Sequence, residues 1–151
     1  MSKIEKDISQ TRPFRNVYHK ASVNLIFTGK WIINLHSGLF KHYGISLQQY
    51  NILRILKGRY PKTATIKSIK KRMLDKMSDA SRIVEILNKK GLISRTLNAE
   101  DRRKVDVKIL QKGLDLLEEI ESQSEKMDNF LSNLNEEEIE QLNFLLDKAR
   151  G

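Results

Sequence analysis

The chain has 151 residues, 39% hydrophobic and 31% charged, which can support a folded core and is too apolar for a disordered protein. It contains no cysteine, which excludes disulfides, thiolate metal sites and thiol redox sensing. The formal net charge of +9 is unevenly distributed, because residues 54–108 hold 17 basic and six acidic side chains. Such a basic segment indicates a polyanionic partner, usually nucleic acid; a solvated basic face without a partner is the alternative.

The ends of the chain limit where the protein can act. Residues 1–15 lack the apolar core of a signal peptide, and no stretch approaches the roughly 20 apolar residues that span a bilayer. We therefore expect a cytoplasmic protein with no membrane partner. Residues 109–151 hold four basic and 11 acidic side chains, so this part opposes the charge of the central segment.

Apolar residues at helical spacing predict a mainly helical protein, beginning with a helix over residues 21–41. Gly44 interrupts this pattern, and Ser46 is expected to cap a second helix. That helix should end at residues 59–62, because a proline inside a helix is unfavourable. The apolar stripe of the first helix consists of Val23, Phe27, Trp31, Leu35 and Leu39.

Two short helices joined by a tight turn are predicted next. Thr65 is expected to cap the first and Ser78 the second. Gly91 should end the second helix, since glycine accepts the left-handed backbone of a helix terminus. Two such helices form a helix-turn-helix pattern. The residues expected to face inward are Ile66, Ile69 and Met73 on the first helix and Ala80, Ile83, Val84 and Leu87 on the second.

A β-hairpin is predicted directly after this pair of helices. Residues 92–97 and 105–109 have the composition and alternation of strands, and the polar residues 98–104 between them form a basic tip. Apolar residues from Leu110 to Leu134 then predict one long helix with a coiled-coil-like seam. Asn135 and Glu138 have the spacing of a capping box. The apolar face of the helix that follows consists of Ile139, Leu142, Leu145, Leu146 and Ala149.

Taken in order, these segments resemble the multiple antibiotic resistance regulator (MarR) family. The segments that carry the resemblance are residues 47–53 (LQQYNIL), 78–84 (SDASRIV), 87–95 (LNKKGLISR), 101–103 (DRR) and 110–113 (LQKG). The resemblance implies a mainly α fold with a small β-hairpin wing, in which a winged helix-turn-helix is flanked by dimerisation helices. The implied domains are an N-terminal dimerisation region over 1–45, a DNA-binding domain over 46–110 and C-terminal dimerisation helices over 111–151.

The resemblance also implies partners and an activity. It implies a homodimer that binds a pseudo-palindromic double-stranded DNA operator and acts as a transcriptional regulator, usually a repressor. The amphipathic end helices fit this, with a bundle inside one chain as the alternative. Two other functions stay open, a nonspecific chromosome-coating protein and a winged-helix adaptor for other proteins. The sequence contains no glycine-rich phosphate loop or nucleophile elbow, so neither enzymatic activity nor a cofactor is expected.

Candidate DNA contacts follow from the position of each residue in the motif. The N-terminal part of the second helix enters the major groove, the helix before it binds phosphates, and a basic wing tip suits a narrow minor groove. Arg82 could instead pair with Glu85 or Asp101, and the wing could be a solvated turn. The candidates are Ser78, Asp79, Ser81, Arg82 and Lys89 on the second helix, Lys67, Lys70, Lys71 and Arg72 on the first, and Arg102, Arg103 and Lys104 on the wing.

Two acidic residues near this surface have expected roles of their own. Asp79 departs from the hydroxyl residue that the family more often has there, so it either accepts a hydrogen bond from cytosine or caps the helix dipole. Asp101 is implied by the resemblance to orient the wing by pairing with an arginine.

The resemblance further implies that a small aromatic or anionic effector binds between the dimer helices and the winged domain. The candidate pocket residues are Phe27, Trp31, Phe40, Tyr43 and Tyr50. Aromatic residues at helical spacing more often pack in a core, which is the alternative. His19, His36 and His42 lack the spacing of paired metal ligands, so no metal site is expected.

Overall fold

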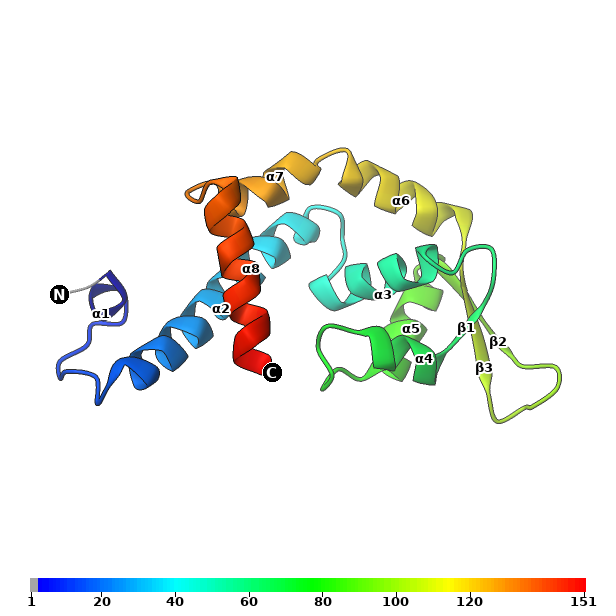
Figure 1. The fold of residues 1–151 in the computed structure, drawn as a ribbon. Helices are drawn as coiled ribbons and strands as arrows, with labels where there is room; N and C mark the ends of the chain where they lie inside the picture. The colour runs from blue at the N-terminus through cyan, green and yellow to red at the C-terminus, as the bar shows by residue number, and fades with distance from the viewer. Residues whose placement is uncertain (1–2) are drawn as a thin grey trace.

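The computed structural model describes residues 3–151 and shows a mainly helical chain with one small three-stranded sheet (Figure 1). In Figure 1, α3, α4, α5 and the sheet lie together on one side, α2 and α8 lie on the other, and α6 and α7 connect them. The elements are α1 (Lys3–Asp7), α2 (Val17–Lys41), α3 (Leu47–Lys57), β1 (Ala64–Thr65), α4 (Ile66–Arg72), α5 (Ala80–Lys89), β2 (Ile93–Leu97), β3 (Val105–Ile109), α6 (Gln111–Glu121), α7 (Ser124–Asp128), the 3-10 turn η1 (Asn129–Leu131) and α8 (Glu136–Arg150).

Local capping chemistry sets where several helices begin and end. The Ser46 hydroxyl accepts a hydrogen bond from the Gln49 amide at 3.1 Å, and the Gln49 side chain accepts from the Ser46 amide at 3.3 Å. The Thr65 hydroxyl caps α4 by accepting from the Ser68 amide at 3.2 Å. Gly91 has φ +71° just beyond α5, a conformation that other residues adopt at a cost. These predicted boundaries are confirmed.

The predicted start of α5 is wrong by one residue. Asp79, not Ser78, is the N-cap, because the Asp79 carboxylate accepts the Arg82 amide hydrogen at 3.1 Å. Ser78 belongs to the preceding turn, where its amide donates to the Asp75 carbonyl at 3.3 Å. Both residue types are good caps, but a carboxylate also interacts favourably with the positive end of the helix dipole.

The predicted hairpin is present and has a third strand beside it. β2 and β3 pair antiparallel, with Ile93 opposite Ile109 and Leu97 opposite Val105. β1 pairs with the other edge of β3, where Ala64 lies opposite Val107, so the strand order is β1-β3-β2. Two residues are too few to show an alternating pattern, so β1 has no signal in the sequence.

The single long helix predicted over residues 110–134 is wrong. α6 ends at Glu121, and α7 and η1 follow after a break at Ser122 and Gln123. The Ser122 hydroxyl donates to the Glu119 carbonyl at 2.6 Å, an example of a short polar side chain that competes for helical backbone groups. The capping box at α8 is confirmed, since Asn135 and Glu138 exchange two hydrogen bonds of 3.0 Å.

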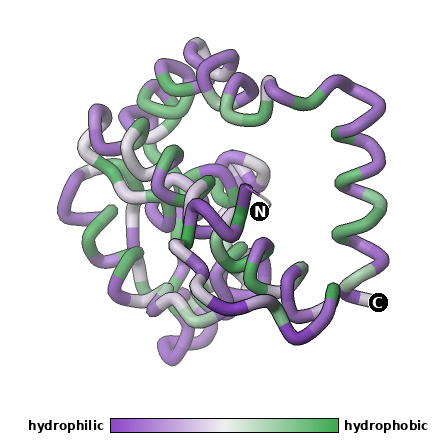
Figure 2. The backbone as a smooth tube through the Cα atoms, turned by 90° about the vertical axis from the view of Figure 1, so that its left-hand side faces the viewer, coloured by the Kyte–Doolittle hydropathy of each residue, from purple (hydrophilic) through white to green (hydrophobic). Residues whose placement is uncertain are grey.

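The hydrophobic core of the described residues lies mainly between α3, α4, α5, the sheet and α6. α2 contributes only Phe40 to the buried residues, and α8 contributes none. Figure 2 shows α8, which ends at the C-terminus, standing apart from the rest with hydrophobic residues along it. No helix of residues 3–151 is both long and apolar enough to cross a membrane. Fully buried core residues include Ile52, Leu53, Leu56, Ile69, Val84, Leu87, Ile93, Val107, Ile109, Leu117 and Ile120.

Candidate nucleic-acid interface

The turn between α4 and α5 is fixed by two side-chain hydrogen bonds. The Leu74 amide donates to the Asn51 side chain of α3 at 2.9 Å, and the Met77 amide donates to the Asp75 carboxylate at 2.9 Å. The first bond joins the turn to the core helix, and the second closes a local turn of the kind that aspartate favours. Together they hold the position at which α5 begins.

The outer face of α5 presents Ser81 and Arg82 to solvent. Ala80, Val84 and Leu87 are buried against the core, so the opposite face of the helix is exposed. Neither predicted alternative for Arg82 occurs. Among residues 3–151, Arg82 forms no ion pair. Glu85 pairs with Lys89, and Asp101 pairs with Arg103. The Arg82 guanidinium is therefore available to an external acceptor.

Three other candidates, Ser78 before α5, its N-cap Asp79 and Lys89 at its end, lie where they are less available to DNA than the sequence suggests. Ser78 is only 9% exposed and its buried hydroxyl has no hydrogen-bond partner, so its predicted place on the outer surface is wrong. Asp79 is exposed, and its carboxylate caps the helix, which is one of its two predicted roles. Lys89 lies at the far end of α5 and pairs with Glu85 at 3.1 Å.

α4 forms a basic surface beside the start of α5. Lys67, Lys70 and Lys71 are exposed, whereas Ile69 packs in the core. These lysines line an open hollow of about 580 Å³ together with Thr65, Ser68 and Lys76. A hollow surrounded by ammonium and hydroxyl groups matches the hydrogen-bonding chemistry of a phosphate.

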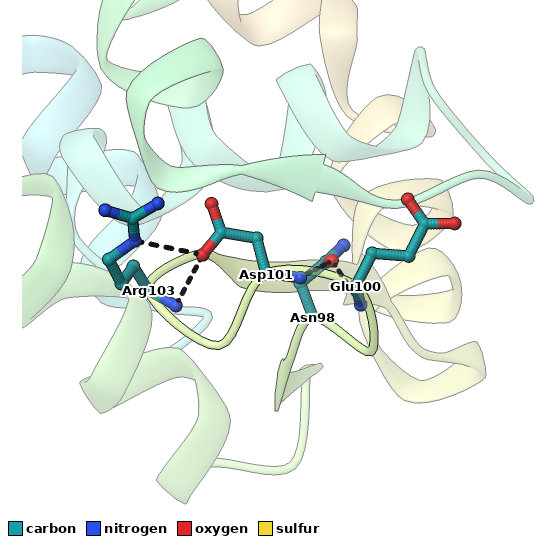
Figure 3. A network of polar contacts seen from close by, with 4 residues as sticks. All are labelled: Asn98, Glu100, Asp101 and Arg103. Atoms are coloured by element: carbon teal, nitrogen blue, oxygen red, sulfur yellow. Dashed lines mark hydrogen bonds and ion pairs between the residues drawn. The ribbon is translucent and has the colours of Figure 1, made fainter.

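The wing tip is ordered by a network of polar contacts (Figure 3). The Asp101 carboxylate accepts from the Arg103 amide at 3.0 Å and from the Arg103 Nε at 3.2 Å. These bonds, the backbone one first, lower the pKa of Asp101 below its ordinary value. The Arg103 side chain nevertheless stays 92% exposed, so one edge of its guanidinium is fixed and the rest faces outward. The predicted pairing of Asp101 with an arginine is present.

Asn98 is a wing residue that was not predicted from the sequence. Its side-chain oxygen accepts from the Glu100 and Asp101 amides, each at 2.9 Å (Figure 3). Its side-chain nitrogen donates to the Asp106 carboxylate of β3 at 2.9 Å. Asparagine at the end of a strand favours a turn, and this was the signal that could have found it. The exposed side chains that this scaffold presents are Arg102, Arg103 and Lys104.

Comparison with known proteins identifies this combination of helix pair and wing. Residues 45–105 match the model of the MarR family. The helix-turn-helix transcriptional regulator PapX of Escherichia coli is 28% identical over 137 residues, which cover 90% of this chain and 82% of that protein. The chain contains a MarR-family domain over residues 45–105. It has a winged-helix fold and is a DNA-binding transcriptional regulator, in a family of regulators rather than enzymes.

Solved structures of MarR proteins superpose over most of the chain. A MarR transcription factor from Planctomyces limnophilus is 28% identical, with a TM-score of 0.71, over 89% of this chain and 98% of that one. The MepR protein of S. aureus, solved in complex with DNA, is 25% identical, with a TM-score of 0.75, over 85% of this chain and 94% of that one. The helices on either side of the winged domain are therefore shared as well.

An ion cluster joins the winged domain of this MarR protein to α6. Glu121, the last residue of α6, accepts from Lys57 of α3 at 2.8 Å and also pairs with Arg54. The hydrogen bond from Lys57 is the main reason that the pKa of Glu121 lies below its ordinary value. The cluster stands directly before the break at residues 122–123, so it ties the base of the arm that contains α7 and α8 to α3.

The five aromatic residues predicted for an effector pocket lie in three separate places. Phe40 is buried and stacks on Tyr50 with ring centroids 4.2 Å apart, so this pair is part of the core. Phe27 and Trp31 line a hollow of about 520 Å³ beside α1. Tyr43 lines a different cavity of about 660 Å³ between the winged domain and α6. The sequence spacing could not show this separation, because it depends on how α2 packs.

His36 is a partly buried histidine on α2 whose Nδ1 atom is buried. Its ring stacks on Phe40 at 5.9 Å and meets the edge of Phe130 at 5.1 Å, and its Nδ1 atom has no hydrogen-bond partner. Burial lowers the pKa of His36. Within residues 3–151, no three histidine, aspartate or glutamate side chains are grouped so that they could hold a metal ion.

Proposed function

We propose that this MarR protein is a homodimeric repressor that binds a pseudo-palindromic operator by sequence and releases it when a small anionic aromatic effector binds. The observation that carries the proposal is the exposed Arg82 guanidinium on the outer face of α5, which has no carboxylate partner among residues 3–151. An arginine at this position of a recognition helix can donate two hydrogen bonds to guanine.

Each part of the DNA surface has its own task in this proposal. The start of α5 enters the major groove, where Ser81 and Arg82 meet base edges or phosphates. The lysines of α4, including Lys67 and Lys70, bind phosphates and so fix the orientation of the domain without reading sequence. Arg103, with one edge held by Asp101, enters the adjacent minor groove, whose negative potential attracts arginine. Arg102 and Lys104 add charge beside it.

Dimerisation is supported by apolar surface that the single chain leaves uncovered. On α2, Leu25 is 51% and Ile26 62% exposed, and on α8, Phe144 is 62% exposed. Water-exposed apolar faces of this extent are typical of surfaces that another protein covers. We assign residues 1–45 and 111–151 to dimerisation and 46–110 to DNA binding. Two copies then present two α5 helices to half-sites about one helical turn apart.

For the effector we favour the cavity of about 660 Å³ that Tyr43 lines. Its wall combines Lys89 and Lys90 from the end of α5 with Lys112 and Leu116 from α6, so it offers both cations and apolar surface, and α6 also contributes two carboxylates, Asp115 and Glu119. The Lys90 ammonium donates to the Gly44 carbonyl at 2.6 Å. A bound carboxylate would compete for this ammonium and move the end of α5, which couples the cavity to the DNA surface.

The proposal is tested by selecting bound DNA from a random duplex library and sequencing it. The wild-type protein should enrich an inverted repeat with half-sites about one helical turn apart. Arg82→Ala and Arg103→Ala should lose much of this enrichment, whereas Arg12→Ala, on an exposed residue outside the winged domain, should keep it. Binding without enrichment would favour a chromosome-coating protein, and absence of binding at moderate salt would favour a protein adaptor; either result overturns the proposal.

A further inference from the structure

A second concentration of positive charge lies beside the helix-turn-helix. Residues 54–72 contain eight basic and no acidic side chains. Two of them, Arg54 and Lys57, are partly neutralised by Glu121. The other six pair with no carboxylate among residues 3–151, and they are Arg59, Lys62, Lys67, Lys70, Lys71 and Arg72. Phosphate binding at the operator was expected of four of these six cations, the three α4 lysines and Arg72, so Arg59 and Lys62 are left without a role.

The remaining cations continue the basic surface of α4 toward the sheet. The Arg72 guanidinium reaches the segment after α3, because its Nη2 lies 3.8 Å from the position that a Cβ on Gly58 would occupy. Arg59 in that segment is held by a hydrogen bond of 3.3 Å to the Thr63 carbonyl. Farther along, the Lys108 ammonium lies 6.0 Å from the Tyr60 ring centroid. We call Arg59, Lys62, Arg72 and Lys108 the lateral basic surface.

Strand register shows that Lys108 points away from the core. Val107 and Ile109 are fully buried, so Lys108 between them projects from the outer face of the sheet. Asp106 is the one acidic residue in the three strands, and it accepts a hydrogen bond from Asn98. Asp106 lies on the same face as Lys108, and the hydrogen bond from the neutral Asn98 amide leaves its charge in place, so the outer face carries one carboxylate beside the Lys108 ammonium. In Figure 1, the segment between α3 and β1 lies on the sheet side of the winged domain, away from α2 and α8.

We propose that the lateral basic surface binds the phosphates of duplex DNA that flanks the operator, so that the DNA bends toward the outer sides of the dimer. This inference rests on the proposed function. The β2–β3 hairpin lies on the same side of the winged domain as this surface, with its tip at the opposite end of the sheet (Figure 1). DNA that leaves the wing therefore reaches the surface by bending back along the hairpin. The surface is continuous with α4 through Arg72. Its cations are exposed rather than enclosed in a pocket, which suits contacts to phosphates that do not depend on sequence.

The experiment compares two lengths of the enriched duplex. The short form, about 20 base pairs, contains only the two half-sites, and the long form extends about 15 base pairs beyond each end. The test variant is Arg59→Gln with Lys62→Gln and Lys108→Gln. The matched control, Arg12→Gln with Arg15→Gln and Lys41→Gln, removes the same charge from exposed residues outside the winged domain. Affinity is measured for each duplex over a range of salt concentrations.

We expect the wild-type protein to bind the long duplex more tightly than the short one, with a steeper salt dependence. The test variant should bind the long duplex about tenfold more weakly, and its salt slope should fall by about 0.9 for each phosphate that it no longer neutralises. Its affinity for the short duplex should equal that of the control variant, which also shows that it is folded. Equal weakening in the test and control variants, or no effect of length in the wild type, would overturn the inference. Equal wild-type binding of short operator and scrambled duplexes would overturn the proposed function itself.

Discussion

At the scale of single residues, Gly113 is where α6 lies against the base of the wing. A Cβ built there would be 2.4 Å from the Leu92 carbonyl oxygen and 2.8 Å from the Ile109 Cγ1 atom. Backbone cannot rotate away as a side chain can, so α6 would have to shift. We expect Gly113→Ala to lower the free energy of unfolding by about 1–3 kcal/mol in a denaturant titration. Gly38→Ala, whose Cβ meets nothing within 4 Å, should raise it by about 0.5–1 kcal/mol.

The neighbours Ser78 and Asp79 are predicted to respond in opposite ways to removal of their side chains. Asp79→Ala removes the cap of α5 and should lower the free energy of unfolding by about 1 kcal/mol. Ser78→Ala removes a buried hydroxyl that has no partner, so it should leave that free energy unchanged or raise it. Thermal and denaturant unfolding of both variants measure this, and a larger destabilisation by Ser78→Ala would mean that Ser78 caps the helix.

At the scale of elements, the pairing of Glu121 with α3 should make stability depend on pH. The pKa of Glu121 is lower in the folded chain than its ordinary value. Its ionised form therefore stabilises the fold at pH above that ordinary value, and this contribution disappears as the pH falls through the lowered pKa. We expect Glu121→Gln to be less stable than wild type at neutral pH and equal to it in acid.

The measurement is the free energy of unfolding of wild type and variant across that pH range. Glu118→Gln is the control, because Glu118 is exposed on the same helix outside this ion cluster. A difference between wild type and Glu121→Gln that grows as the pH falls would contradict the role given to the cluster.

Which elements the sequence predicted depends on how local their causes are. The caps at Ser46 and Thr65 were predictable because a hydroxyl and the amide three residues on decide them. β1 was not, since its two residues form a strand only by pairing with β3. The break at Ser122 was hidden by an apolar repeat that continues through it. On the candidate site, residue types placed Arg82 and the wing, whereas packing decided that Ser78 is buried.

At the scale of the whole molecule, the two chains of the proposed dimer must cover each other's apolar end helices. The double variant Ile26→Glu with Phe144→Glu places one charge on the apolar face of α2 and one on that of α8. Each of these two residues is 62% exposed in the single chain. We expect this variant to be monomeric by light scattering, because burying unpaired carboxylates in an interface is strongly unfavourable. Leu74→Glu, on an 81% exposed residue of the winged domain, should leave the oligomeric state unchanged. A dimeric double variant would contradict the assignment of these helices to dimerisation.

The central claim is that Arg82 reads the DNA sequence. It is tested most directly by the ratio of two binding affinities. The ratio compares the enriched inverted repeat with a scrambled duplex of the same length and composition, for wild type and for Arg82→Ala. We predict that Arg82→Ala lowers the ratio by about tenfold or more while affinity for the scrambled duplex changes little, since one arginine–guanine pair discriminates by about 1–3 kcal/mol. An unchanged ratio, with both affinities lowered equally, would show that Arg82 binds phosphate and that the sequence is read elsewhere.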